Sequence, residues 1–342
     1  MTAALPPGHL AAQTARHSPA VSRLSLRPLL DPATLPPELR DGHVVVGNFD
    51  GVHRGHQSVI RQAAEPAHAA GRPVVALTFE PHPRAFFQPE RPLFRLTGRD
   101  EKARQLARAG ADATVVLTFD AALATQEAED FIAQTLVGKL AAHTVVVGWD
   151  FHFGRGRRGS PAFLAEAGPR HGLYVEVAPP YGGTTPVSSS AIRDHLAAGE
   201  ILAAGRLLGR RWIVEGEVVH GDKRGRDLGF PTANIRLAPE TRLKHGIYAV
   251  RALIDGSIVD GAASFGRRPQ FDDGAPLFET YLFDFSGDLY GKPLRIELAS
   301  YLRPEEKFKS VEALVEQMAR DVENARAALA APEDPLAPSA LI

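Results

Sequence analysis

The first half of the sequence alternates between short β-branched runs and longer segments with helical spacing. Five runs can form strands, namely residues 44–46, 74–79, 114–119, 144–147 and 174–177. The apolar residues of the intervening segment 128–140 fall on one face of a helix. Nearly continuous apolar strands separated by helices indicate a parallel sheet that is covered on both faces. We therefore predict a doubly wound α/β domain.

The pattern changes after Gly209, where the strand-like runs have connectors too short for helices. These runs occupy residues 212–219, 246–254, 257–265, 277–285 and 294–302. Asp255 and Gly256 separate two of them and form a strong hairpin signal. The series predicts an antiparallel barrel or sandwich. Apolar residues at helical spacing follow from Val311 to Val322, after a serine at position 310 that can cap a helix.

These patterns divide the chain into four parts. Residues 21–203 form the expected α/β domain, and residues 204–330 form the antiparallel domain with its closing helix. Residues 1–20 are expected to be a disordered extension, with a transit peptide as the alternative because they contain no acidic residue. Residues 331–342 are expected to be an unstructured tail.

Composition restricts the partners of such a chain. Its 39 basic and 40 acidic residues give a formal charge of −1, so no global field attracts nucleic acid or an anionic membrane. No cysteine is present, which excludes disulfides and thiolate zinc sites and fits a reducing cytoplasm. We expect small-molecule partners, no nucleic acid or membrane, and a cytoplasmic location. The sequence leaves the oligomeric state open.

The segment GNFDGVHRGHQ, residues 47–57, follows the first apolar run. It permits a metal pair made by His53 and His56, a plain capped turn, or a phosphate cradle. A metal site would need further ligands, and Asp50 is the one carboxylate nearby. The cap alone explains the turn, whereas a phosphate cradle also explains the histidines and the position after a first strand.

Three further motifs lie in the first half. TFEPHPRAFF, residues 78–87, forms either a rigid turn or a stiff ligand-binding loop at a strand end. GRGRRG, residues 154–159, matches the dinucleotide pattern formally, but its arginines favour a basic loop near a nucleotide. In VSSSAIRDHL, residues 187–196, the serines can cap a helix, and Arg193 one turn later can reach a phosphate.

The second half carries GDKRGRDLGFPTANI at residues 221–235. A solvated loop is the plain interpretation of this segment. Thr232 and Asn234 alternate along an extended stretch and point to one face, where oxygen ligands suit magnesium. Glu279 lies among apolar neighbours, where a carboxylate needs a partner or a function.

Taken in order, GNFDGVHRGHQ, TFEPHPR, GWDFHFG, SSSAIR, LGFPTAN and ETYLFDF resemble the bifunctional bacterial riboflavin kinase and FAD synthetase family. The resemblance implies a Rossmann-like nucleotidylyltransferase domain that adenylylates FMN, followed by a six-stranded barrel that phosphorylates riboflavin. It also implies ATP with Mg²⁺, and riboflavin, FMN and FAD as substrates or products.

In the α/β domain the resemblance implies that His53, His56 and Arg193 take part in adenylyl transfer. The implied ATP-phosphate contacts are Gly47, Asn48, Phe49, Asp50, Gly51, Gly55, Ser189 and Ser190. The implied flavin contacts are Pro81, His82, Pro83, Phe87, Asp150 and Phe153.

In the barrel the resemblance makes Glu279 the base that takes the proton from the ribityl hydroxyl. Thr232 and Asn234 would hold magnesium. The implied ATP contacts are Gly221, Lys223, Arg224, Gly225 and Gly229.

Several positions depart from the family pattern, and two of these departures affect the charge near a phosphate. Asp150 stands where the family commonly has asparagine, and Pro186 stands where it often has a basic residue. Both changes make the surroundings of a phosphate more negative or less positive. The sequence therefore leaves two alternatives to the bifunctional enzyme, namely a riboflavin kinase with a weakened adenylyltransferase site and a non-catalytic flavin-binding or regulatory protein.

Overall fold

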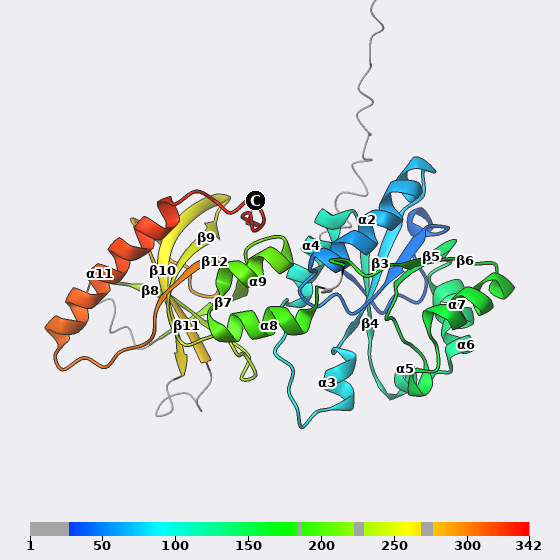
Figure 1. The fold of residues 1–342 in the computed structure, drawn as a ribbon, viewed down its shortest axis with the longest axis horizontal. Helices are drawn as coiled ribbons and strands as arrows, with labels where there is room; N and C mark the ends of the chain where they lie inside the picture. Colours follow the sequence, from blue (N-terminus) through cyan, green and yellow to red (C-terminus); the bar gives the residue numbers. More distant parts are fainter. Residues whose placement is uncertain (1–26, 184–186, 222–228, 268–275, 342) are drawn as a thin grey trace, which may run out of the picture.

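A parallel sheet forms the core of the first domain in the computed structural model, which describes residues 27–183, 187–221, 229–267 and 276–341 (Figure 1). Its strands are β1 (Leu29–Leu30), β2 (His43–Val46), β3 (Val74–Glu80), β4 (Ala113–Thr118), β5 (Thr144–Gly148) and β6 (Tyr174–Ala178). They lie in the order β1-β4-β3-β2-β5-β6, and all neighbours are parallel. The five expected strands are confirmed.

This strand order places a reversal of direction at β2. The chain runs from β2 through β3 to β4 on one side, then continues with β5 and β6 on the other side. The carboxyl ends of β2 and β5 therefore border the point where open α/β sheets bind ligands.

Helices cover both faces of the sheet. On one face α2 (Arg54–Ala69) and α4 (Arg99–Ala109) bury apolar residues such as Ile60 and Leu106. The other face carries α6 (Ala128–Asp130), the π-helical segment η2 (Phe131–Lys139) and α7 (Pro161–Ala167). The smaller helical elements are η1 (Pro37–Leu39), α3 (Pro83–Phe87), α5 (Ala121–Thr125), η3 (Arg155–Arg157) and η4 (Gly168–His171).

The second domain is a closed antiparallel barrel. Its strands are β7 (Ile213–Val219), β8 (Thr232–Arg236), β9 (Gly246–Ile254), β10 (Ser257–Arg267), β11 (Pro276–Leu282) and β12 (Pro293–Arg303). Their order is β10-β11-β8-β7-β12-β9, and β9 closes the barrel against β10. The expected hairpin is confirmed, because Asp255 and Gly256 both have positive φ (49° and 81°), as a two-residue type I′ turn requires.

A long helix, α11 (Val311–Ala330), packs on the outside of the barrel (Figure 1). Ser310 caps it, because the Ser310 hydroxyl accepts a hydrogen bond from the Ala313 amide at 3.2 Å. The contact buries small residues of the barrel exterior against Ala325 and Leu329. The expected closing helix is therefore confirmed.

The two domains share one apolar core. The connecting helices α8 (Ser189–Ala198) and α9 (Ile201–Leu208) belong to the same buried cluster as the barrel interior, and so does Phe94 of the α/β domain. The Trp212 indole N–H donates to the Leu96 carbonyl at 2.8 Å. The expected boundary after residue 203 falls inside α9, which is continuous.

Residues 331–341 differ from the expected unstructured tail, because they pack at the junction between the domains (Figure 1). Ala337, Ala340 and Leu341 are almost completely buried. The buried Glu297 carboxylate accepts from the Ser339 hydroxyl at 2.8 Å and from the Ala340 amide at 3.2 Å.

Donors from both domains explain this packing. The Ala340 carbonyl accepts from Arg108 Nη1 of α4 at 2.7 Å and from Arg295 Nη2 of β12 at 3.1 Å. The Leu336 carbonyl accepts from Arg54 at the start of α2 at 2.9 Å. A segment without helical or strand periodicity is held here because distant side chains bind its backbone.

Truncation after Ala330 should destabilise the protein. Among the described residues, the nearest donors left to the Glu297 carboxylate would be Arg211 at 3.8 Å and Arg251 at 3.9 Å. The carboxylate would also become accessible to water. We expect a loss of about 3 kcal/mol, because a buried carboxylate loses both of its close hydrogen-bond donors. Differential scanning calorimetry should show the unfolding midpoint falling by about 5 °C or more. Adding Glu297→Gln to the truncated chain should recover part of the loss, and an unchanged midpoint after truncation would contradict this role.

Candidate active sites

The loop between β2 and α2 forms the centre of the first candidate site. Phe49 and Val52 have positive φ (49° and 42°), which non-glycine residues adopt only when the surroundings impose it. Gly51 has a φ of 86°, and a Cβ added there would lie 2.9 Å from Leu96. The loop is thus held in a costly conformation at the edge where ligands bind in such sheets.

Two histidines stack at the start of α2. His53 is the N-cap, and its Nδ1 accepts from the His56 amide at 3.3 Å. The two ring centroids are 3.7 Å apart with an interplanar angle of 16°. Among the atoms that the structure describes, His56 Nδ1 is buried and has no hydrogen-bond partner.

Burial keeps both imidazoles neutral. Burial, with a smaller contribution from the positive charge of Arg210, lowers the pKa of His53 to about 4. Burial also lowers the pKa of His56 well below its usual value, with smaller contributions from His53 and Lys102. Each ring therefore offers one N–H at neutral pH, which can donate to a phosphate oxygen without adding a charge.

Asp50 is turned away from the histidines. Its Oδ1 accepts from the Leu96 and Thr97 amides at 3.0 and 3.3 Å, and its Oδ2 forms an ion pair with Arg193. Within the described ranges, no cluster of His, Asp and Glu side chains suits a metal ion. The metal-pair interpretation of the two histidines therefore finds no support in the geometry.

Helix α8 meets this loop from the other side. The Ser189 hydroxyl donates to the Asp50 carbonyl at 2.8 Å, and Ser190 lies exposed in the first turn of α8. Arg193 differs from the expected open phosphate contact: its Nε donates to the Phe94 carbonyl at 2.6 Å, and its Nη2 binds Asp50. The expected residues do come together, but Arg193 ties the loop to α8.

Sequence reasoning missed several charged groups around this loop. Lys102 donates to the Asn48 carbonyl, and Arg210 donates to the Gly51 carbonyl at 2.9 Å. Burial lowers the pKa of Arg210 to about 10, which leaves it charged at neutral pH. Six charged side chains bind the loop or the residues that hold it, and both histidines are neutral. The four cations and two carboxylates sum to a charge of +2, namely Lys102, Arg95, Arg193 and Arg210 against Asp50 and Glu80.

The flavin contacts implied by the sequence lie beyond β3. His82 caps α3, because its Nδ1 accepts from the Arg84 amide at 3.1 Å. Burial lowers the pKa of His82 to about 4. Phe87 is 61% exposed and packs edge-on against Phe86 and Phe119 at 5.3 and 5.6 Å. An exposed aromatic surface therefore lies at the carboxyl end of β3, and a flat apolar ring of a ligand can stack on such a surface.

Two expected flavin contacts after β5 have different surroundings. Asp150 is exposed in the turn that follows the strand. Phe153 instead packs in the core, with Phe131 at 5.3 Å, so only a small part of its ring is exposed. Trp149, which is 51% exposed, is the aromatic residue left open beside Asp150.

The second candidate site lies on the barrel exterior. Asn234 of β8 pairs directly with Glu279 of β11, which pairs with Ser264 of β10 on its other side. Paired residues project on the same face, and Thr232, two residues before Asn234, shares it. The structure therefore places Thr232, Asn234 and Glu279 on one face of two adjacent strands.

These three residues offer oxygen atoms of the kind that magnesium binds. Asn234 is buried, and its Oδ1 has no hydrogen-bond partner among the described atoms. Gly221 packs so closely that a Cβ there would meet Asn234 Nδ2 at 2.0 Å. Gly229 is exposed with a φ of 86°, whereas the expected ATP contacts 223–225 lie outside the described residues.

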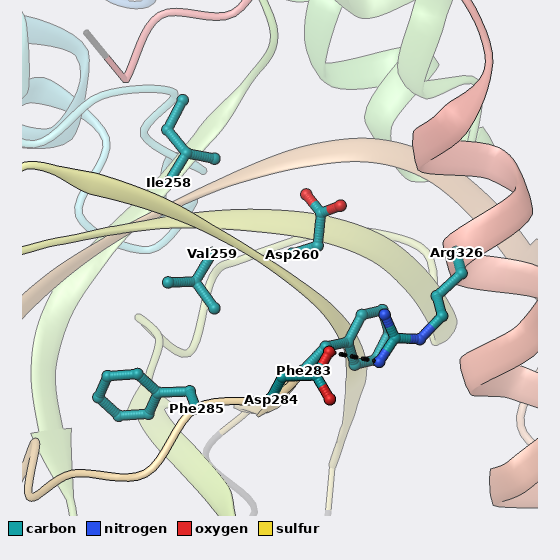
Figure 2. Close-up of a pocket in the computed structure, with 7 residues that line it drawn as sticks. All are labelled: Ile258, Val259, Asp260, Phe283, Asp284, Phe285 and Arg326. Atoms are coloured by element: carbon teal, nitrogen blue, oxygen red, sulfur yellow. Dashed lines mark hydrogen bonds and ion pairs between the residues drawn. The ribbon is translucent and has the colours of Figure 1, made fainter.

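A pocket of about 390 Å³ opens between β10, the segment after β11 and α11 (Figure 2). Arg326 forms an ion pair with Asp284 at 2.8 Å, and its guanidinium lies 4.5 Å from the Phe283 ring centroid. Phe283 follows Glu279 by four residues, which corresponds to roughly 13 Å of extended chain. The volume is suitable for a flat ring system.

The fold and the two sites define a nucleotide-binding α/β domain joined to a phosphate-handling barrel. The family model for FAD synthetase matches residues 35–191, and the model for riboflavin kinase matches residues 208–329. The chain belongs to the bifunctional riboflavin kinase/FMN adenylyltransferase family. It is therefore an enzyme of two classes, a kinase and a nucleotidyltransferase.

Relatives with this name match most of the chain. The protein of Haemophilus influenzae is 40% identical, covering 83% of this chain and 93% of its own length. The protein of Pseudomonas fluorescens is 42% identical, with 87% and 96% covered. The protein of Escherichia coli K12 is 37% identical, with 83% and 91% covered.

A crystal structure described as a macrolide-efflux protein from Streptococcus pneumoniae matches both domains. It has a TM-score of 0.75 and 32% identity, covering 86% of this chain and 95% of that one. This likeness supports the two-domain fold. None of the helices in the described part of the chain has the length and apolarity to cross a membrane.

Asp50→Asn should lower stability, because Arg193 would remain buried without a charged partner. We expect the free energy of unfolding of the α/β domain to fall by about 3–5 kcal/mol in urea titrations. Asp41→Asn, at the exposed pair with Arg72, should change it by less than about 1 kcal/mol. Equal small effects for both variants would show that the Asp50 contacts contribute little.

Proposed function

We propose that the barrel transfers the γ-phosphate of ATP to riboflavin, and that the α/β domain then joins the adenylyl group of a second ATP to the FMN product. The products are FAD and pyrophosphate. The observation that carries this proposal is the presence in one chain of two separate arrangements, namely a neutral histidine pair in a positively charged loop and a Thr–Asn–Glu group on the barrel.

For adenylyl transfer, an oxygen of the FMN phosphate attacks the α-phosphorus of ATP, and the bond from that phosphorus to pyrophosphate breaks. Negative charge gathers on the leaving group, where His53 and His56 can each donate an N–H. The buried cations around the loop favour this charge without forming a covalent bond. Positioning and electrostatics thus carry the reaction.

The remaining residues of this site divide by ligand. We propose that Gly47, Asn48, Phe49, Gly51, Gly55, Ser189 and Ser190 surround the ATP phosphates. Asp50 and Arg193 hold this loop against α8. Pro81, His82, Pro83 and Phe87 would line the flavin, with Asp150 beside it; Trp149 replaces Phe153 as the aromatic contact after β5.

For the kinase reaction, Glu279 takes the proton from the ribityl hydroxyl as its oxygen attacks the γ-phosphorus of ATP. Bound Mg²⁺ would neutralise charge on the ATP phosphates, and Thr232 and Asn234 would hold it. Gly221 and Gly229 would lie against ATP together with Lys223, Arg224 and Gly225. The pocket beside Arg326 would receive the flavin ring, since its lining residue Phe283 follows Glu279 by four residues along the chain.

Two substitutions should separate the activities. Glu279→Gln should reduce FMN formation about 10²- to 10⁴-fold, since the base is lost, and leave FAD formation from added FMN intact. His56→Ala should reduce FAD formation about 10²- to 10³-fold, since a donor to the leaving group is lost, and leave FMN formation intact. Chromatography of reactions with riboflavin or FMN, ATP and Mg²⁺ measures both.

The exposed Glu217→Gln variant on β7 serves as the matched control for Glu279, and both of its activities should stay unchanged. A wild-type protein that forms neither product would contradict the proposal. Accumulation of FMN without FAD would favour the kinase-only alternative, and flavin binding without turnover would favour a regulatory protein.

Asp150→Asn tests whether this carboxylate weakens adenylyl transfer. Asp150 is exposed at the end of β5, next to the strand that leads into the phosphate loop. Removing its charge should raise the rate of FAD formation about two- to fivefold, since an exposed charge contributes up to about 1 kcal/mol. The gain should shrink at high salt, which screens the repulsion. An unchanged rate at low salt would exclude this effect.

We also propose a cytoplasmic location. ATP is a substrate in both reactions, and the sequence contains no cysteine that would form a disulfide.

A further inference from the structure

Lys102 of α4 is among the largest completely buried side chains of the protein, with 1% exposure. Lysine is almost never fully buried without partners. The sequence around it, RDEKARQLARA, gives no sign of this burial, because charged residues dominate the segment. Above, this ammonium group counts only as one of four cations around the loop, without a role of its own.

The ammonium group uses its three donors on the phosphate-loop edge of the sheet. It donates to the Asn48 carbonyl at 3.1 Å, to Glu80 Oε1 at 3.1 Å and to the Thr78 hydroxyl at 3.4 Å. The Thr78 hydroxyl itself donates to the same Asn48 carbonyl at 3.1 Å. Two donors therefore fix one carbonyl of the loop that leads to His53.

Glu80 keeps the ammonium group in place. Both oxygens of the Glu80 carboxylate accept hydrogen bonds from the guanidinium of Arg95. The carboxylate is therefore held by Arg95 as well as by Lys102. Burial and the positive charge of Arg95 lower the pKa of Lys102, whereas Glu80 raises it. The carboxylate thus supports the charged form inside the protein.

We propose that Lys102 is a positioning residue for adenylyl transfer. It fixes the loop through the Asn48 carbonyl and contributes positive potential at His56. The inference rests on the proposed adenylyltransferase function of this domain.

Two effects follow from this position. The carbonyl contact fixes the Asn48–Phe49 peptide unit and thereby the course of the loop that leads to His53 at the start of α2. The charge disfavours a proton on His56, as burial does. Lys102 therefore supports a neutral imidazole next to a site that must accept a triphosphate.

Other charges around the histidines come from several elements. Arg210, after α9, lowers the pKa of His53, and Arg193 of α8 is neutralised by Asp50 within the loop. Glu80 of β3 is shared between Lys102 and Arg95. Replacing Lys102 by a neutral residue therefore leaves Glu80 paired with Arg95 and removes one positive charge next to His56.

Lys102→Met is the test, because methionine fills similar space without the ammonium group. We expect kcat for FAD formation from FMN to fall about 10- to 100-fold, as misplacement of a catalytic loop does. The acid limb of the kcat/KM profile should move to higher pH, because the pKa of His56 rises when a nearby positive charge is lost. FMN formation in the same molecule should stay unchanged.

Two further variants separate position from charge and from stability. Thr78→Val removes the second donor to the Asn48 carbonyl but no charge, so it should lower kcat less and leave the acid limb in place. Arg99→Met, on the exposed part of α4, should change neither quantity. Circular dichroism melts of each variant report on folding.

The inference is overturned if Lys102→Met lowers the melting temperature but retains kcat and the acid limb, since Lys102 would then be only structural. If the variant does not fold, Lys102→Gln in the presence of ATP replaces it under the same criteria. A wild-type protein that forms no FAD from FMN would contradict the proposed function instead, so the two failures are distinguishable.

Discussion

The carboxylate of Asp50 joins three parts of the α/β domain at one point. The carboxylate accepts hydrogen bonds from two amides in the segment before α4 and forms an ion pair with Arg193 of α8. The backbone carbonyl of the same residue accepts a hydrogen bond from the Ser189 hydroxyl. A buried pair of this kind contributes little net stability but imposes geometry, because each charge is costly without the other. The strained loop, the histidine stack and the start of α8 all take their positions from this contact.

Much of the fold could be predicted because its signals are local. Parallel strands covered on both faces read as continuous apolar runs, and the Asp255-Gly256 turn specifies a hairpin by its dihedral preferences. Strand β1 has only two residues, too few to show a period. Strand β8 lies after a loop rich in glycine and cations, so it was predicted as an extended segment rather than as part of the sheet.

The candidate sites were predictable only in part. Short motifs make His53, Asn234 and Glu279 candidates, because each lies in a few residues of recognisable spacing. Lys102 and Arg210 were not identified, since their contacts with the loop depend on burial against segments distant in the sequence. The packing of residues 331–341 depends in the same way on arginines from both domains, which no local pattern reveals.

The common core of the two domains affects how the chain folds during synthesis. The α/β domain leaves the ribosome first, yet Phe94 and Leu96 belong to a cluster completed by Trp212 and the barrel interior. These side chains and the Leu96 carbonyl have no partner in the barrel until the second half has folded. The newly made first domain therefore exposes an apolar surface next to its phosphate loop, and an α/β domain expressed alone would keep that surface and tend to aggregate.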